Sequence, residues 1–293
     1  MTRKTRSYFY LGLCIISWAL IPVVSKKMLI ELDNLQILFY STIFSVLSMI
    51  CILIYQNKFS LFKKYSSFDY LNMAWLGFLG TYLYYILLYG AFALTSASEG
   101  FILAYTWPIL VLVLAFILLK ERVTIKKIIS ILISFMGIWV IVSKGNLSSL
   151  NFSSLNGDLL ALAGAFVFAL FSVLGKKSKY DQVISVFIYF LTALFLLVPT
   201  IFLFSSLKLP SLEIWPWIVL NGLLVNGISY VFWFKALEYG DTSVLTNTLY
   251  LTPFTSLLFI TLFLGEPILI SSVIGLLIVV TGIFLQSMRF KKN

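Results

Sequence analysis

The sequence predicts an all-α membrane protein in which ten transmembrane helices form two inverted five-helix repeats around a central cavity. Three observations support this fold class. The 293 residues are 61% hydrophobic and 11% charged, with a mean hydropathy of +1.03. Apolar runs of about 20 residues recur along the chain, which is the length a membrane-spanning helix needs. The second half of the chain also repeats the first half, which indicates a duplicated architecture.

The composition excludes several classes of protein. A soluble domain of this size could not cover so much apolar surface, and the ~10-residue alternation of a membrane β-barrel is not visible. The net charge of +10 is explained by basic loops on one side of a lipid bilayer, so no nucleic-acid partner is expected. The chain has no histidine, and its two cysteines lack metal-ligand spacing. We therefore expect no enzyme, no cofactor and no metal site.

The first five spans begin near the N-terminus and follow one another through short connections. The run Tyr8–Ser25 has basic flanks like a signal peptide. It lacks a small-residue cleavage pattern and takes part in the repeat, so we expect it to be retained. The other four spans of this half are Asn34–Tyr55, Tyr70–Tyr89, Glu99–Leu119 and Lys126–Val142.

The second five spans come after the longest outer connection, Ser143–Asn156, which is rich in serine and asparagine. This connection divides the chain into a first repeat, residues 1–145, and a second repeat, residues 146–293. The spans of the second repeat are Gly157–Gly175, Val183–Phe204, Trp215–Phe234, Ser243–Leu264 and Ile268–Met288.

The repeat aligns without a gap over most of its length when the chain is displaced by 145 residues. The first spans match at a displacement of 150, which places Trp18 over Phe168 and Lys26 over Lys176. Several residue types that are hard to match by chance coincide at the displacement of 145. These pairs are Tyr105 with Tyr250, Pro108 with Pro253, Glu121 with Glu266, and Gly137 with Gly282.

The distribution of lysine and arginine predicts the orientation. With the N-terminus in the cytoplasm, 17 of these residues fall in inner segments and four in outer ones. Both termini are then cytoplasmic, and we expect a multi-pass protein of the cytoplasmic (inner) membrane. Because each repeat has an odd number of spans, the two repeats must have opposite orientations. The basic hairpin 119–127 aligns with 264–272. The second segment has Glu266 at the position of Glu121 and no lysine or arginine.

These features together resemble a known family. The mid-span proline, the hairpin glutamate and the two inverted five-helix repeats are similar to the EamA group of the drug/metabolite transporter superfamily. The stretch Tyr105–Pro108 also resembles the Y-L-W-P stretch of the aromatic amino-acid exporter branch, although Thr106 replaces the leucine. The resemblance implies that helices 1, 3, 4, 6, 8 and 9 line the cavity.

The function that the resemblance implies is secondary transport of small metabolites by alternating access. We expect an amino-acid exporter, and the alternative is uptake of a small metabolite or of an organic cation such as choline. The expected partners are a small-molecule substrate, chiefly amino acids, and the lipid bilayer. The absence of a G-x-x-x-x-G-K-[ST] loop indicates that a solute or ion gradient supplies the energy. The sequence leaves the coupling ion and the oligomeric state open.

Pro108 and Pro253 are the candidate helix kinks. A proline inside a helix removes a backbone donor, and the result is either a static bend or a pivot or discontinuity that faces the cavity. Glu121 and Glu266 lie at hairpins near the membrane surface, where a structural role is expected. Thr124 is positioned to cap the helix that follows Glu121.

The third span places aromatic residues along one helical face, where they either pack between helices or form a cavity wall. Tyr82 and Tyr85 belong to this face, and Tyr230 lies on the matching face of the eighth span. Tyr105 and Tyr250 each precede a proline by three residues, so we expect their rings to bracket the substrate from opposite sides.

Polar residues within the spans complete the candidate site. Glu99 is either an intramembrane carboxyl or a solvated acid at the start of its helix. The amides of Asn226 and Asn247 either join helices by hydrogen bonds or bind substrate. The predicted substrate-binding residues are Trp18, Tyr82, Tyr85, Glu99, Tyr105, Asn226, Tyr230, Asn247 and Tyr250.

Overall fold

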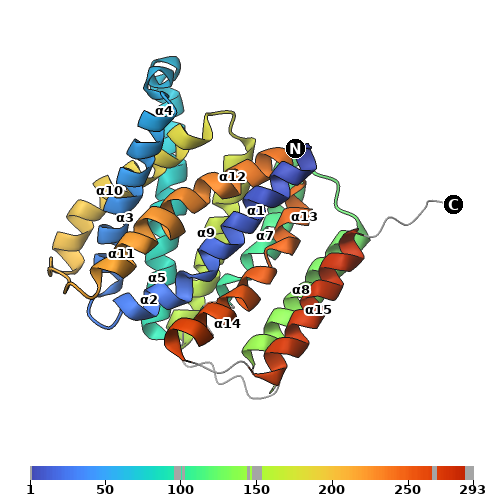
Figure 1. Cartoon of the computed structure of the whole chain (residues 1–293). Coiled ribbons are helices and arrows are strands. Elements are labelled where there is room, and N and C mark those ends of the chain that lie inside the picture. The colour runs from blue at the N-terminus through green and yellow to red at the C-terminus, as the bar shows by residue number, and fades with distance from the viewer. Residues whose placement is uncertain are drawn as a thin grey trace.

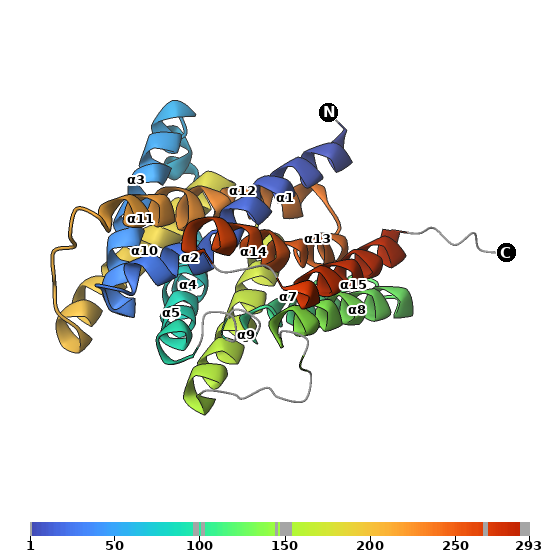
Figure 2. The same cartoon turned by 60° about the horizontal axis from the view of Figure 1, so that its bottom comes forward.

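A computed structural model describes residues 2–95, 100, 103–143, 146, 154–265 and 269–287. All regular secondary structure within these residues is helical, and the helices form one bundle (Figure 1, Figure 2). Seven segments of the described chain are long and apolar enough to cross a bilayer, and shorter apolar helices accompany them. The all-α membrane fold is therefore confirmed, while the number of ten spans stays a prediction.

The helices of the first half agree with the predicted spans, and several spans are divided into two or three pieces. The elements are α1 (Arg3–Ala19), α2 (Ile21–Met28), α3 (Asn34–Tyr55), η1 (Phe59–Lys64), α4 (Ser67–Gly77), η2 (Phe78–Leu83), α5 (Tyr84–Leu94), α7 (Trp107–Leu119) and α8 (Ile125–Val142).

The helices of the second half show divisions at corresponding places. The elements are α9 (Leu155–Lys177), α10 (Gln182–Phe204), α11 (Trp215–Leu220), η3 (Asn221–Ile228), α12 (Ser229–Tyr239), α13 (Thr242–Thr248), α14 (Leu251–Leu264) and α15 (Ile270–Ser287).

Side-chain caps set where several helices begin. The Asp33 carboxylate accepts hydrogen bonds from the backbone N–H groups of the first turn of α3, and Asp181 does the same for α10. Such caps satisfy donors that the helix itself leaves free. Thr124 accepts from the N–H of Lys127, which confirms the predicted cap of α8. These caps place the helix starts at the ends of the bundle.

Both mid-span prolines lie next to an interruption of their span, which is one of the two alternatives expected for them. Pro108 lies in the first turn of α7, directly after a turn at Tyr105 and Thr106. Pro253 lies in the first turn of α14, after a turn at Leu249 and Tyr250. Proline is well tolerated in a first turn because the N–H groups there have no acceptor within the helix. Each proline therefore starts a half-helix, and the span is interrupted just before it.

The third and eighth spans both pass through a π-helical segment. The segments η2 and η3 lie at corresponding positions in the two halves of the chain. A π-helical turn accommodates one additional residue, which rotates the side chains that follow relative to those that precede it. In both spans the residues that come directly after this segment point towards the interior of the bundle.

Helices α8 and α15 pack side by side at one edge of the bundle (Figure 1, Figure 2). A Cβ added at Gly137 would lie 2.6 Å from the carbonyl oxygen of Gly275, and one added at Gly282 would lie 2.7 Å from that of Ser130. The two contacts are equivalent under the displacement of 145 residues. Only glycine permits this approach of the two backbones, and the helices run antiparallel.

Candidate functional site

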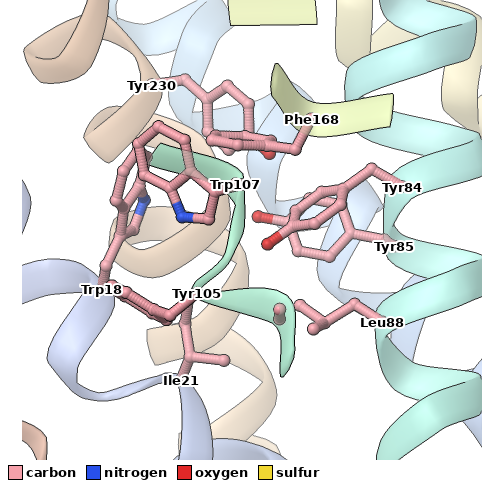
Figure 3. Close-up of a pocket in the computed structure, with 10 residues that line it drawn as sticks. Trp18, Ile21, Tyr84, Tyr85, Leu88, Tyr105, Trp107, Phe168 and Tyr230 are labelled. Carbon is pink, nitrogen blue, oxygen red and sulfur yellow. The ribbon is translucent and has the colours of Figure 1, made fainter. Parts of the chain in front are cut away.

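A cavity lies in the interior of the bundle, where the interrupted spans meet (Figure 3). All of its lining residues are buried, and seven are aromatic. The space open to the centre of a water molecule is about 20 Å³, which holds one or two waters. The lining residues are Trp18, Ile21, Tyr84, Tyr85, Leu88, Ala104, Tyr105, Trp107, Phe168 and Tyr230.

Trp18 holds a central place among the rings around this cavity. Its ring centroid lies 5.7 Å from that of Phe168 and 6.2 Å from those of Trp107 and Tyr230, with edge-to-face orientations. Its indole N–H donates a hydrogen bond of 2.9 Å to the Ser229 hydroxyl. Edge-to-face contacts are the favoured arrangement of aromatic pairs. The indole is thus fixed in place, and its ring presents apolar surface to the cavity.

Tyr84 and Tyr85 supply hydroxyl groups to the cavity. Figure 3 shows both hydroxyls pointing from α5 towards Trp107 on the opposite wall. Both residues begin the α-helix α5, directly after the π-helical segment η2. The Tyr230 hydroxyl donates instead to the Gly80 carbonyl oxygen within η2, at 3.1 Å. This bond joins the two π-containing spans at the level of the cavity.

A polar layer lies next to the aromatic cavity. Tyr89 stacks on Tyr85 with ring centroids 5.4 Å apart, and its hydroxyl accepts a hydrogen bond of 2.9 Å from the Asn221 amide. The same amide donates to Ser41 at 2.8 Å. Asn226 is completely buried next to this layer, beside the Tyr89 hydroxyl. A buried amide needs hydrogen-bond partners, so Asn226 extends the polar layer towards α12.

The structure brings four predicted site residues to the cavity. They are Trp18, Tyr85, Tyr105 and Tyr230. Tyr82 was predicted with them, but its hydroxyl bonds to that of Thr200 on α10 at 2.6 Å, outside the cavity lining. The reason is the π-helical segment, which turns Tyr82 and Tyr85 onto different faces.

The other predicted residues have different surroundings. Tyr250 is buried but does not line the cavity. The Asn247 amide lies 3.4 Å from the Gly282 carbonyl oxygen of α15, which places it at a helix interface. Asn226 is one helical turn before Tyr230, in the polar layer. Glu99 and Glu266 lie outside the described residues.

The sequence interpretation missed three aromatic lining residues. Phe168 aligns with Trp18 in the repeat, and this alignment could have identified it. Trp107 lies within the stretch that resembles the exporter motif. Tyr84 is adjacent to Tyr85, and no sequence pattern distinguishes which of two neighbouring tyrosines faces a cavity. Both tyrosines line the cavity, and their ring centroids lie 5.0 Å apart.

Comparison with known proteins agrees with the fold. The model of the EamA-like transporter family matches residues 5–143 and again residues 155–288. The chain belongs to the EamA-like transporter family. Each half of this EamA-like transporter is therefore similar to the family model by itself.

Relatives of similar length support the assignment. An uncharacterized transporter of Archaeoglobus fulgidus is 25% identical, with 98% of this chain and 99% of that protein covered. The uncharacterized transporter YoaV of Bacillus subtilis is 30% identical, with 74% of each chain covered. A crystal structure with 17% identity superposes with a TM-score of 0.83 over 97% of this chain and 96% of the other, which shows a shared fold. The EamA-like chain is thus a multi-pass membrane transporter.

Proposed function

We propose that this EamA-like transporter is a secondary transporter that works by alternating access around the aromatic cavity. The observation that carries the proposal is the cavity itself, which is buried among interrupted helices from both halves of the chain. It is too small for a metabolite in this conformation, as expected for a closed state. Binding of a substrate requires the surrounding helices to move, and the interruptions before Pro108 and Pro253 supply points where they can do so.

Two inverted repeats, residues 1–145 and 146–293, are part of this proposal. The antiparallel contact of α8 and α15 supports them, because Gly137 and Gly282 make equivalent close approaches. Repeats of opposite orientation permit one bundle to tilt against the other around a fixed central site. Such tilting would open the cavity to each side of the membrane in turn.

Amino-acid export is the transport reaction we infer, and the site has two parts that suit it. The aromatic wall would bury an apolar or aromatic side chain, since seven rings line the cavity. The buried amide of Asn226, beside Tyr89, would donate and accept hydrogen bonds with the polar end of the substrate. These hydrogen bonds would replace those that the substrate loses to water on entering the cavity.

The membrane assignment follows from the charged residues. We propose the cytoplasmic membrane, with both termini in the cytoplasm. In Figure 1 the N-terminus, the connection from α7 to α8 and the connection from α9 to α10 lie towards one end of the bundle. These segments and the helix ends beside them are rich in lysine and arginine, as an inner surface would be.

Uptake of a small organic cation such as choline is the second candidate. The observation that favours it is the aromatic character of the wall, because a cation is attracted to the faces of tryptophan and tyrosine rings. No charged side chain occurs among the described residues that line the cavity. A cation would therefore depend on the rings and hydroxyls alone.

Purified protein in liposomes distinguishes the two candidates. Counterflow of labelled phenylalanine, leucine and choline should show exchange of the amino acids and none of choline if the chain is an amino-acid exporter. The variant Tyr85→Ala should abolish most of the exchange, while Tyr82→Ala, outside the cavity lining, serves as the matched control. Exchange of choline alone would replace the first candidate by the second. Exchange that Tyr85→Ala leaves unchanged would remove the cavity from the transport path.

A further inference from the structure

A cluster of charged side chains joins the two halves of the chain, away from the cavity. One Glu121 carboxylate oxygen, Oε1, accepts hydrogen bonds from Lys176 Nζ and from the Thr242 hydroxyl, each at 3.0 Å. Lys176 also bonds to the Thr242 hydroxyl, so the three groups form a closed triangle. The side chains of Lys176 and Glu121 are only 22% and 21% exposed. This ion pair is sheltered, and it connects α9 and α13 to the turn after α7.

A second ion pair reinforces the same junction. Lys127 Nζ lies 3.2 and 3.0 Å from the two carboxylate oxygens of Asp241. Asp241 also caps α13 by accepting from the Val244 N–H at 3.1 Å. Asp241 is adjacent to Thr242, so the Lys127–Asp241 pair and the Lys176–Glu121 pair both contact the start of the short helix α13. We name the five residues Glu121, Lys127, Lys176, Asp241 and Thr242 the inter-repeat cluster.

Both ion pairs of the inter-repeat cluster, and the hydrogen bond from Thr242 to Glu121, cross between the halves. Glu121 and Lys127 belong to the first half, and their partners belong to the second. The cluster lies at the end of the bundle that the charge distribution predicts to be cytoplasmic. It therefore closes one end of the boundary along which two tilting repeats would separate.

The helices that the cluster joins are those that carry the cavity. Helix α9 contributes Phe168 to the wall and reaches Lys176 two turns later, about 12 Å along its axis. Helix α7 begins at the lining residue Trp107 and ends just before Glu121. Helix α13 runs from Thr242 to the interruption that precedes α14. Separation of the inner ends of these helices would open a path to the cavity.

We propose that the inter-repeat cluster is a latch that closes the cytoplasmic side of the transport path and breaks when the cavity opens there. The proposal rests on the proposed alternating-access function. A half-buried ion pair suits a reversible latch, because water can solvate the separated charges once the helices part. The latch then biases the equilibrium between two states without locking either of them.

A cysteine between the cavity and the latch reports access from the cytoplasmic side. Ser172 is buried on α9, one helical turn from Phe168 and one from Lys176. Ser172→Cys, in a chain without Cys14 and Cys51, would be treated in inside-out membrane vesicles with a membrane-impermeant maleimide, and the labelling rate measured. No substrate is added, so the readout does not depend on which solute is transported.

Loss of the latch should expose this cysteine. Glu121→Gln should increase the labelling rate about fivefold, which corresponds to the loss of one half-buried ion pair. Arg122→Gln is the matched control, because this exposed neighbour has no side-chain contact with the cluster within the described residues. Its labelling rate should equal that of the parent chain.

A charge swap tests the pairing itself. Glu121→Lys and Lys176→Glu should each increase the labelling rate, and the double variant should return it towards the parent value. Size-exclusion chromatography of each variant identifies folding defects, because like charges in the single variants could also disturb folding. Equal labelling rates in the parent and all cluster variants, with unchanged elution in size-exclusion chromatography, would overturn the latch. That result would leave the transport proposal intact, because solute exchange is measured separately.

Discussion

Tyr85 and Tyr230 occupy equivalent positions in the two halves, 145 residues apart, and their ring centroids lie 6.3 Å from each other in the cavity wall. Each follows a π-helical segment of its own span. The corresponding tyrosines of the two halves thus lie next to each other in one cavity wall, with their ring planes tilted by 46°.

The equivalence of these tyrosines predicts similar effects of truncation. Tyr85→Ala and Tyr230→Ala should each raise the half-saturating substrate concentration about fivefold, since a ring contact contributes roughly 1 kcal/mol. Tyr85→Phe should change it less, because the ring area is retained. The measurement is initial transport rate against concentration in liposomes. A change in only one of the two alanine variants would contradict a shared binding role.

The close contact of α8 and α15 predicts a matched loss of stability. Gly137→Ala and Gly282→Ala should each lower the free energy of unfolding by about 1–3 kcal/mol, because the new methyl group meets a backbone carbonyl. Thermal unfolding in detergent measures the effect. Gly12→Ala is the control: nothing lies within 4 Å of its added Cβ, so helix propensity should make that variant slightly more stable.

Asp241 predicts a pH dependence of stability. Burial acts to raise the pKa of this carboxyl, but the hydrogen bond and charge of Lys127, the Val244 N–H and the charge of Lys176 together outweigh burial, and the pKa lies below its usual value. A carboxyl with a lowered folded-state pKa stabilises the protein above pH ~4 and loses this contribution as the pH falls further. Because the side chain is 47% exposed, the contribution should stay below about 1 kcal/mol.

The variant Asp241→Asn tests this dependence. It should be less stable than the parent chain at pH 7, and the difference should shrink as the pH approaches 3. Melting temperatures in detergent at several pH values provide the measurement, and the exposed carboxyl variant Glu213→Gln is the control. A difference that stays constant down to pH 3 would show that the ion pair with Lys127 has no effect on stability.

The proposed orientation predicts the outcome of reporter fusions. Fusions after Asn57, Thr124 and Lys179 should report the cytoplasm, whereas fusions after Asn146 and Lys208 should report the outside. The Lys58–Asp181 ion pair of 2.6 Å already places two of the inner connections next to each other. The same location for the Asn146 and Lys179 fusions would rule out two repeats of opposite orientation.

The sequence alone was sufficient for the helical membrane fold and for part of the site. Hydropathy determined where the helices lie, because a segment that crosses lipid must satisfy its backbone hydrogen bonds within its own helix. Trp18, Tyr85, Tyr105 and Tyr230 could be predicted as cavity residues from the repeat and from helical spacing. The cap at Thr124 could be predicted because capping depends only on neighbouring residues.

Tertiary structure alone decided which of these side chains meet. Tyr82 lies outside the cavity and Tyr84 lines it, because the π-helical segment η2 shifts the helical phase within the third span. A regular 3.6-residue period does not predict that shift. The pairing of Glu121 with Lys176 depends on how two separate helices pack. Neither residue has a local partner that would reveal the other, because contacts across 55 positions arise only when the whole bundle has folded.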